Sequence, residues 1–248
     1  MTGIRGIFAG ALLGSLAVAM ASPAMAQVTQ VSPGSLTATG LVTFDDVAGG
    51  NSPGTNYNAL FVSGNVAFGE RFQGQTLVPS GNFDTLTGAP TAGLTLLTGA
   101  TNQNLNIFTF DTQVLTGLGP LGFPSGDAIG EGAIALRFGL PQSEFGFQLL
   151  GGNAGSADIN FYAIDGSLID SITLTGLSDQ TYAFARDGNV ADIAGITIIN
   201  NDDAGIGLDN LRYNTIGGNP LPTSTPEPAS LALLAAGLVG LGATRRRR

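Results

Sequence analysis

The side chains of this chain that could do chemistry are almost all carboxylates. The sequence has 18 Asp and Glu residues against 9 Lys and Arg, and it has no cysteine and no histidine. A thiol nucleophile, a thiolate metal site and a Ser-His-Asp triad are therefore excluded. Two kinds of chemistry remain: binding of a hard divalent cation by oxygen ligands, and acid–base catalysis by a pair of carboxyl groups.

Three aspartates are placed in a way that favours a calcium site. Asp45 and Asp46 end the first strand that we predict in the folded region, and Asp209 lies in the last one. First and last strands are often neighbours in a sandwich, so Asp45 or Asp46 would approach Asp209, and main-chain carbonyls would complete the shell of six to eight oxygens. The alternative is that Asp45 and Asp46 cap a turn and Asp209 accepts hydrogen bonds from local amides.

The acidic turn 200–203, Asn-Asn-Asp-Asp, is a further source of oxygen ligands for calcium, although its composition is more typical of a solvated loop. Carboxylate catalysis would require a pair of acids across a cleft, as in glycoside hydrolases. The folded region offers Glu70, Glu131 and Glu144, and nothing in the sequence pairs them. We therefore interpret them as surface carboxylates and predict no enzymatic activity.

Sugar binding would require exposed aromatic rings. The chain has no tryptophan, and its tyrosines are Tyr57, Tyr162, Tyr182 and Tyr213. A partly buried structural role is the favoured interpretation for each of them, because tyrosine combines an apolar ring with a hydroxyl that finds a partner. A glycan-binding module that uses Tyr and Asn/Asp side chains is the alternative function.

Short apolar runs separated by Gly, Asn, Asp and Ser predict many strands joined by turns. The clearest hairpin joins 159–164 to 168–174 through Asp165-Gly166, a pair that accepts positive φ. Residues 27–39 read as a flexible leader or an edge strand, and the poorly patterned stretch 74–132 reads mostly as long loops. The pattern predicts an all-β fold, an antiparallel two-sheet sandwich over residues 27–216. The other predicted strands are 41–44, 66–72, 105–110, 133–138, 145–150, 182–184, 193–199 and 207–213.

The N-terminal segment is typical of a secretory signal. Arg5 is the only charge before Asp45, an apolar stretch follows at 7–21, and Ala24-Met25-Ala26 has the small-x-small pattern of a signal-peptidase site. We predict a signal helix within a signal peptide of residues 1–26, cut after Ala26. An uncleaved membrane anchor is disfavoured because the apolar stretch is short.

The C-terminal segment has three features in a fixed order. Pro226, Glu227 and Pro228 are followed by sixteen residues, 229–244, without a charge. The chain then ends in an arginine cluster: Arg245, Arg246, Arg247 and Arg248. We predict a linker at 217–225 and a short transmembrane helix whose arginines stay on the cytoplasmic side. An ordinary tail anchor is the alternative.

Net charge excludes one class of partner. Removing Arg5, the four terminal arginines and Glu227 from the totals leaves 17 acidic and 4 basic residues in 27–225, a net charge of −13 without a single lysine. Such a surface repels nucleic acid and anionic lipid. We expect no nucleic-acid partner.

The Pro-Glu-Pro, apolar segment and arginine cluster resemble the PEP-CTERM sorting signal of Gram-negative bacteria. The resemblance implies a protein exported through the inner membrane, anchored there transiently, and cut near Pro226-Glu227-Pro228 by an exosortase. It also implies a final place at the cell surface or in the extracellular matrix, and a link to exopolysaccharide and biofilm. We therefore expect signal peptidase and exosortase as processing partners, and exopolysaccharide as a possible ligand.

A second resemblance covers most of residues 41–213. The VTFDD start, the SEFGFQLLGG segment, the NFYAIDGSLIDSITL hairpin and the GIGLDNLRY end look like the β-sandwich ectodomains of PEP-CTERM proteins. They are also similar to jelly-roll carbohydrate-binding modules. This resemblance implies a jelly-roll-like sandwich with a structural calcium ion held by Asp45 and Asp209, with Asp46 as the alternative to Asp45. The function expected from both resemblances is structural or adhesive.

Overall fold

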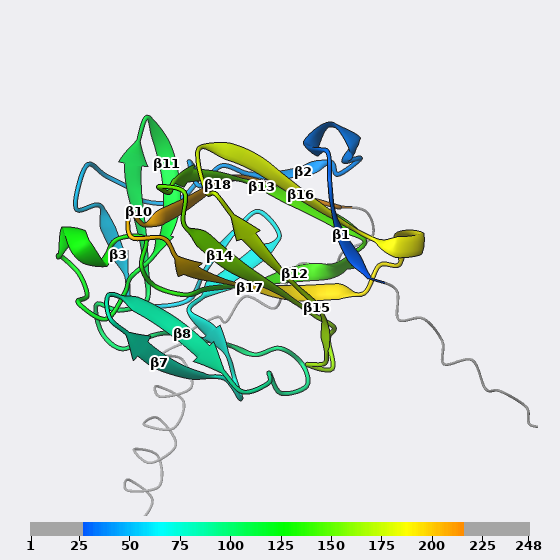
Figure 1. Cartoon of the computed structure of the whole chain (residues 1–248), viewed down its shortest axis with the longest axis horizontal. Helices are drawn as coiled ribbons and strands as arrows, with labels where there is room; N and C mark the ends of the chain where they lie inside the picture. Colours follow the sequence, from blue (N-terminus) through cyan, green and yellow to red (C-terminus); the bar gives the residue numbers. More distant parts are fainter. Residues whose placement is uncertain (1–26, 216–248) are drawn as a thin grey trace, which may run out of the picture.

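The described part of the chain is an antiparallel β-sandwich. The computed structural model describes residues 27–215, and in them two large sheets face each other across an apolar core (Figure 1). The signal helix predicted in residues 1–26 and the linker and sorting helix predicted in 217–248 lie outside the described residues. Within 27–215 there is no helix long and apolar enough to cross a membrane.

The first sheet has eight strands. Its order is β1-β16-β13-β18-β11-β10-β3, and β2 also pairs with β18. The strands are β1 (Val28–Val31), β2 (Gly40–Val42), β3 (Thr55–Tyr57), β10 (Leu105–Phe110), β11 (Thr112–Gly117), β13 (Glu144–Gly151), β16 (Gln180–Arg186) and β18 (Ile206–Tyr213).

The second sheet has six strands in the order β15-β14-β17-β12-β5-β4, and two small hairpin-like sheets, β6-β9 and β7-β8, stand beside it. Its strands are β4 (Phe61–Ser63), β5 (Val66–Gly69), β12 (Ile134–Gln142), β14 (Ser156–Tyr162), β15 (Leu168–Thr175) and β17 (Ile193–Asn201). The small sheets contain β6 (Arg71–Phe72), β7 (Thr76–Ser80), β8 (Phe83–Thr87) and β9 (Leu96–Leu97). Single 3-10 turns occur at η1 (Pro33–Ser35), η2 (Gly126–Ala128) and η3 (Asp187–Asn189).

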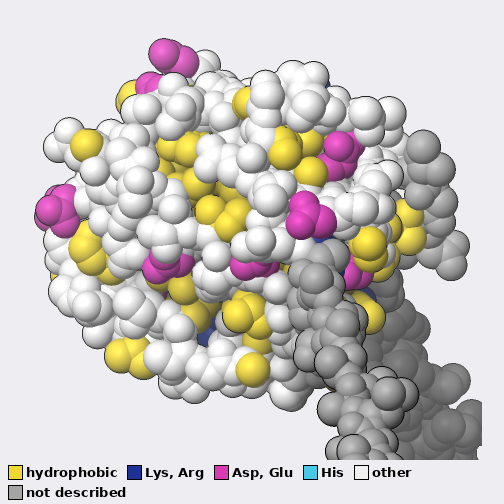
Figure 2. Space-filling model, turned by 45° about the vertical axis from the view of Figure 1, so that its right-hand side comes forward, with side chains coloured by type: hydrophobic (Ala, Val, Ile, Leu, Met, Phe, Trp, Pro, Cys, Tyr) yellow, Lys and Arg dark blue, Asp and Glu magenta, His cyan; other side chains and the backbone are white. Residues whose placement is uncertain are grey.

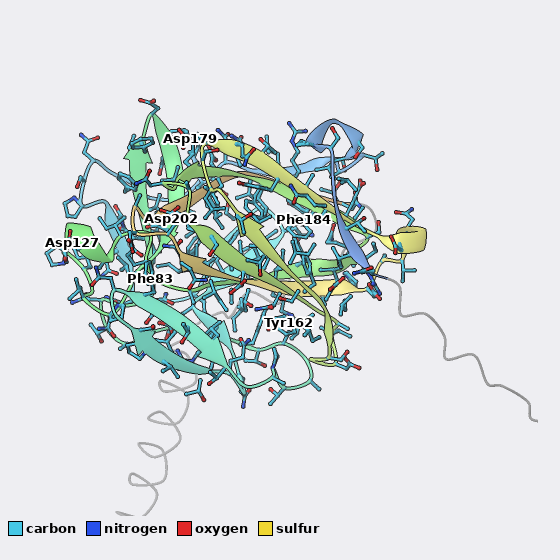
Figure 3. The ribbon with its side chains drawn as sticks, in the orientation of Figure 1. Phe83, Asp127, Tyr162, Asp179, Phe184 and Asp202 are labelled. Atoms are coloured by element: carbon cyan, nitrogen blue, oxygen red, sulfur yellow. The ribbon has the colours of Figure 1, made fainter. Side chains whose placement is uncertain are left out.

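Alternating apolar residues build the core between the sheets. In β14, Ile159 and Phe161 are fully buried while the intervening Asn160 is partly exposed. Phe184 lies between the two layers (Figure 3), and its ring stacks on that of Phe145 with centroids 5.1 Å apart. Because each buried aromatic side chain removes a large apolar area from water, this cluster is the main source of stability of the sandwich.

Most of the predicted strands are confirmed. The strand at 105–110 has the expected bounds, and those at 133–138, 145–150, 182–184, 193–199 and 207–213 are present but longer. The leader forms the edge strand β1, which pairs with β16. The first and last predicted strands are neighbours, with Val42 of β2 opposite Leu211 of β18.

Other predictions about the elements need correction. The hairpin is present, but its ladder ends at Tyr162 rather than 164, and Gly166 takes the positive φ of 86°. The strand at 66–72 breaks at Glu70, because β5 pairs with β12 while β6 turns away to pair with β9. Residues 74–132 contain more strands than predicted, since β7, β8, β9 and β11 lie there along with the predicted β10. Cross-strand pairing decides such Thr- and Gly-rich segments, so local composition misreads them.

Candidate functional site

The three aspartates predicted to bind calcium lie where β2 and β18 meet. Asp45 and Asp46 are exposed and follow Phe44, a core residue that turns the chain with φ of 57°. Asp46 Oδ1 accepts a hydrogen bond from the Ser63 hydroxyl at 2.5 Å. Ser63 belongs to β4, so this contact joins the turn to another strand and is not the turn cap of the alternative interpretation, while the Asp45 side chain is exposed.

Asp209 is buried on β18. Its Oδ2 accepts a hydrogen bond from the Thr112 hydroxyl at 2.8 Å, and its Oδ1 accepts one from the Asn210 main-chain N–H at 2.6 Å. Burial raises the pKa of the Asp209 carboxyl, these two hydrogen bonds lower it, and the negative charge of Asp45 raises it further.

Residues 27–215 contain no group of three or more His, Cys, Asp or Glu side chains arranged to hold a metal ion. A calcium ion between Asp45 and Asp209 would thus take most of its ligands from main-chain oxygens and water. Calcium binding at Asp45, Asp46 and Asp209 stays a prediction.

The turn 200–203 is not a solvated loop throughout. Asn200 and Asp202 are buried, whereas Asn201 and Asp203 are exposed. The Asp202 carboxylate accepts hydrogen bonds from the main-chain N–H groups of residues 153, 155 and 204 at 2.6–3.0 Å. Its oxygens therefore organise two loops at one end of the sandwich.

The three glutamates considered for catalysis are all buried, so the interpretation of them as surface carboxylates was wrong. Glu144 Oε1 accepts hydrogen bonds from the Thr37 main-chain N–H at 2.7 Å and from its hydroxyl at 2.6 Å. Glu70 forms an ion pair with Arg71. Glu131 Oε2 accepts a hydrogen bond from Asn200 Nδ2 at 3.0 Å. Each glutamate thus has a structural contact of its own.

Two of these glutamates are electrostatically unusual. Burial raises the pKa of the Glu131 carboxyl to about 7; the Asn200 hydrogen bond lowers it, and the charges of Asp203, Asp202 and Asp127 raise it. Burial also raises the pKa of Glu70, while the neighbouring Arg71 lowers it. A raised pKa is typical of general acids, but it is equally typical of acids that are merely buried.

The tyrosines offer little surface to a sugar. Tyr162, Tyr182 and Tyr213 are each 4–5% exposed. Tyr57 is half-buried, its hydroxyl donates to the Ala48 carbonyl oxygen at 2.6 Å, and its ring packs against Phe61. The predicted structural role is confirmed for the three buried tyrosines.

A hollow on the outer face of the eight-stranded sheet was missed by the sequence reasoning. It has a volume of about 260 Å³ and is lined mainly by apolar side chains and glycine backbone. Phe108 and Phe110 of β10 stand on one side of it, Val114 and Thr116 of β11 form its floor, and Leu150 of β13 closes it. Phe110 is 50% exposed. Residues on β10 alternate, with Leu105 and Ile107 directed into the core and Phe108 and Phe110 directed outward. This alternation was the sequence signal that could have located the hollow.

Fold and geometry define an antiparallel β-sandwich over residues 27–215. The model of one protein family, the PEP-CTERM protein-sorting motif, matches residues 224–248. No curated protein matches the chain. The chain therefore carries a PEP-CTERM sorting motif at its C-terminus, and this motif marks an exported protein that is sorted to the cell surface and processed by exosortase.

Proposed function

We propose that this chain is a non-catalytic structural or adhesive protein of the cell surface or extracellular matrix, linked to exopolysaccharide and biofilm. The single observation that carries the proposal is the sorting motif at residues 224–248. In this proposal the apolar helix anchors the chain in the inner membrane of a Gram-negative bacterium until exosortase cuts near Pro226-Glu227-Pro228.

The character of the folded part supports a structural role. Acidic side chains are scattered over the face seen in Figure 2, and few basic ones are visible there. The described residues hold only two salt bridges, Arg71–Glu70 and Arg186–Asp192. A rigid, acidic sandwich stays soluble and resists self-association, which suits a displayed or released matrix component. Its non-catalytic nature is supported by the separate structural contacts of Glu70, Glu131 and Glu144.

The intact mass of the protein recovered from its native host tests the route. We expect loss of residues 1–26 and of a C-terminal segment, with the second loss absent in a strain without exosortase. Replacing Pro226, Glu227 and Pro228 by alanine should block the C-terminal cut. The matched control replaces Pro220 and Pro222, which lie outside the motif and should leave processing unchanged. A retained arginine tail in the wild-type strain would contradict the route.

Attachment assays test the role. A strain that lacks the protein should form less surface-attached biomass, and the wild-type gene should restore it. The variant altered at Pro226, Glu227 and Pro228 should fail to restore it, because the protein then stays at the membrane. Equal attachment of the deletion strain and the wild type would refute a structural or adhesive role.

We propose that calcium stabilises the sandwich through Asp45 and Asp209, in the jelly-roll-like manner that the sequence resemblance implies. The pairing of β2, which precedes Asp45, with β18, which carries Asp209, supports this. Calcium should raise the melting temperature of the wild-type chain, and Asp209→Asn should reduce that rise, whereas the exposed control Asp203→Asn should not. An equal rise in Asp209→Asn would remove Asp209 from the site.

Glycan binding is the second candidate function, and the hollow beside Phe108 and Phe110 favours it. An exposed phenyl ring offers an apolar face on which a sugar ring can pack. Affinity electrophoresis in gels that contain the host exopolysaccharide should show retardation of the wild type. Phe110→Ala should weaken binding at least fivefold, about 1 kcal/mol, while Leu121→Ala, an exposed leucine outside the hollow, should not. Identical mobility of the wild type with and without polysaccharide would refute this function.

A further inference from the structure

Two buried carboxylates have oxygens that no hydrogen-bond donor satisfies. Glu70, between β5 and β6, and Asp84, in β8, are each 1% exposed. Glu70 Oε1 and both carboxylate oxygens of Asp84 are buried without a hydrogen-bond partner. The buried Asp202 and Asp209 carboxylates, by contrast, accept several hydrogen bonds. Unsatisfied buried carboxylate oxygens are costly, so their presence calls for a ligand.

Both carboxylates border the segment that leads into β12. The Asp84 main-chain N–H donates to the Glu131 carbonyl oxygen at 3.2 Å. Gly69, which precedes Glu70, lies opposite Ala135 in the β5–β12 pairing. The negative charge of Glu70 also raises the pKa of Asp84, in addition to the larger effect of burial. Glu70 and Asp84 therefore lie buried beside the same segment of the chain, although they are 14 positions apart in the sequence.

One positive charge, that of Arg71, lies beside Glu70. Arg71 pairs with Glu70 Oε2, and the same guanidinium donates to the Thr98 carbonyl oxygen at 3.0 Å. Glu70 Oε1 points instead toward Gly99, where a Cβ would lie only 2.3 Å away. The Gln103 carbonyl oxygen approaches the same position to 2.2 Å. The Glu70 carboxylate oxygen and the Gln103 carbonyl oxygen therefore lie close together against the main chain of Gly99.

We propose that Glu70 and Asp84 bind a divalent cation, calcium or magnesium, at a buried site distinct from Asp45 and Asp209. Glu70 Oε1 and the two Asp84 oxygens supply the anionic ligands. The Gln103 carbonyl oxygen and water supply neutral ones, which fits the mixed oxygen shells that these ions accept. The cation satisfies the three open oxygens and removes the repulsion between the carboxylates, so its role is to fasten the β7–β8 hairpin to the sandwich.

Equilibrium dialysis of the full-length chain tests the proposal. The chain is first stripped with a chelator and then dialysed against calcium or magnesium, and bound metal is counted by mass spectrometry. We expect Asp84→Asn and Glu70→Gln each to lose one bound ion per chain relative to wild type. Asp203→Asn is the matched control, because it removes an exposed carboxylate that belongs to neither candidate site and should leave the number of bound ions unchanged.

Thermal unfolding of the same samples gives the second readout. A cation at a hundredfold excess over its Kd should raise the melting temperature of the wild type by about 5–10 °C. In Asp84→Asn the rise should be smaller than in the wild type, and in the exposed control Asp203→Asn it should be unchanged. Unchanged stoichiometry in both Asp84→Asn and Glu70→Gln, or a wild-type chain that binds neither metal, would overturn the site. Neither result depends on exosortase processing, so the proposed function is tested separately.

Discussion

Glu131→Gln is the most informative single substitution for the electrostatics of this sandwich. Glu131 is 5% exposed, and its Oε2 accepts a hydrogen bond from Asn200 Nδ2 at 3.0 Å. Glutamine has nearly the same shape, and its carbonyl oxygen can accept the same hydrogen bond. The substitution therefore removes the negative charge and little else.

The sign of the effect follows from the raised pKa. The Glu131 carboxyl has a pKa of about 7 in the folded chain against the ordinary 4.5. The folded state holds the proton more tightly, so ionisation costs stability as the pH rises from about 4.5 to about 7, and the cost is constant above that range. At pH 4 both forms are neutral, and the wild type and Glu131→Gln should be equally stable.

The magnitude follows from the size of the shift. One pKa unit corresponds to 1.36 kcal/mol, so the full shift is worth about 3 kcal/mol. Screening by water at the edge of the sandwich reduces this value. We expect Glu131→Gln to be more stable than the wild type by about 1–3 kcal/mol at pH 8, which raises the melting temperature by several degrees.

Urea denaturation followed by circular dichroism, in chelator and at pH values from 4 to 8.5, measures this difference. Asp203→Asn is the control, because it removes an exposed negative charge close to Glu131 without removing the buried one. A stability difference that does not change with pH, or a less stable Glu131→Gln at pH 8, would refute the assignment of the cost to a buried, ionised Glu131.

Three further substitutions test the packing. Asp202→Ala removes the acceptor of three main-chain N–H groups and should destabilise the fold by about 2–4 kcal/mol, with faster hydrogen exchange in the two loops that Asp202 joins. Unchanged hydrogen exchange in those loops would contradict the inference that Asp202 holds them together. Phe184→Ala, beside Phe145 in the core, should cost about 3–5 kcal/mol in urea denaturation, and a cost below about 1 kcal/mol would mean that the core is not packed there. Gly117→Ala places a Cβ 2.2 Å from the Gly132 carbonyl oxygen, so a thermal melt should show a loss of at least about 1 kcal/mol; an unchanged melting temperature would speak against this close approach.

The sequence pattern was sufficient to predict a strand where apolar and polar residues alternate within the strand itself. The hairpin β14–β15 was predictable because Ile159 and Phe161 alternate with polar residues and Asp165-Gly166 marks the turn. The strands β10, β13, β17 and β18 were predictable for the same reason. The hairpin β7–β8 was not, because Thr, Gly and Pro dominate it and its strand character comes from cross-strand pairing and from contact with β17.

For the candidate sites, too, some features were predictable from the sequence and others were not. The approach of Asp45 to Asp209 was inferred from strand order, and the electrostatic effect between them agrees with it. The direction of the Asp209 side chain was not predictable from the sequence. It depends on the irregular register between β13 and β18 and on the left-handed φ of 49° at Asn210. Asp84 gave no sequence signal, because a single aspartate in a Thr-rich segment is ordinary until a neighbouring strand buries it.

The sequence by itself determined where the protein goes and which chemistries it lacks. A sorting signal is read as a linear segment, so Pro226, Glu227, Pro228 and the terminal arginines need no tertiary context, and the absence of Cys and His is a matter of composition. Only the tertiary structure decided which carboxylates are buried. The free energy of an ionised side chain depends on its distance from water and from other charges, and pairing between distant strands sets both for Glu70, Asp84 and Glu131.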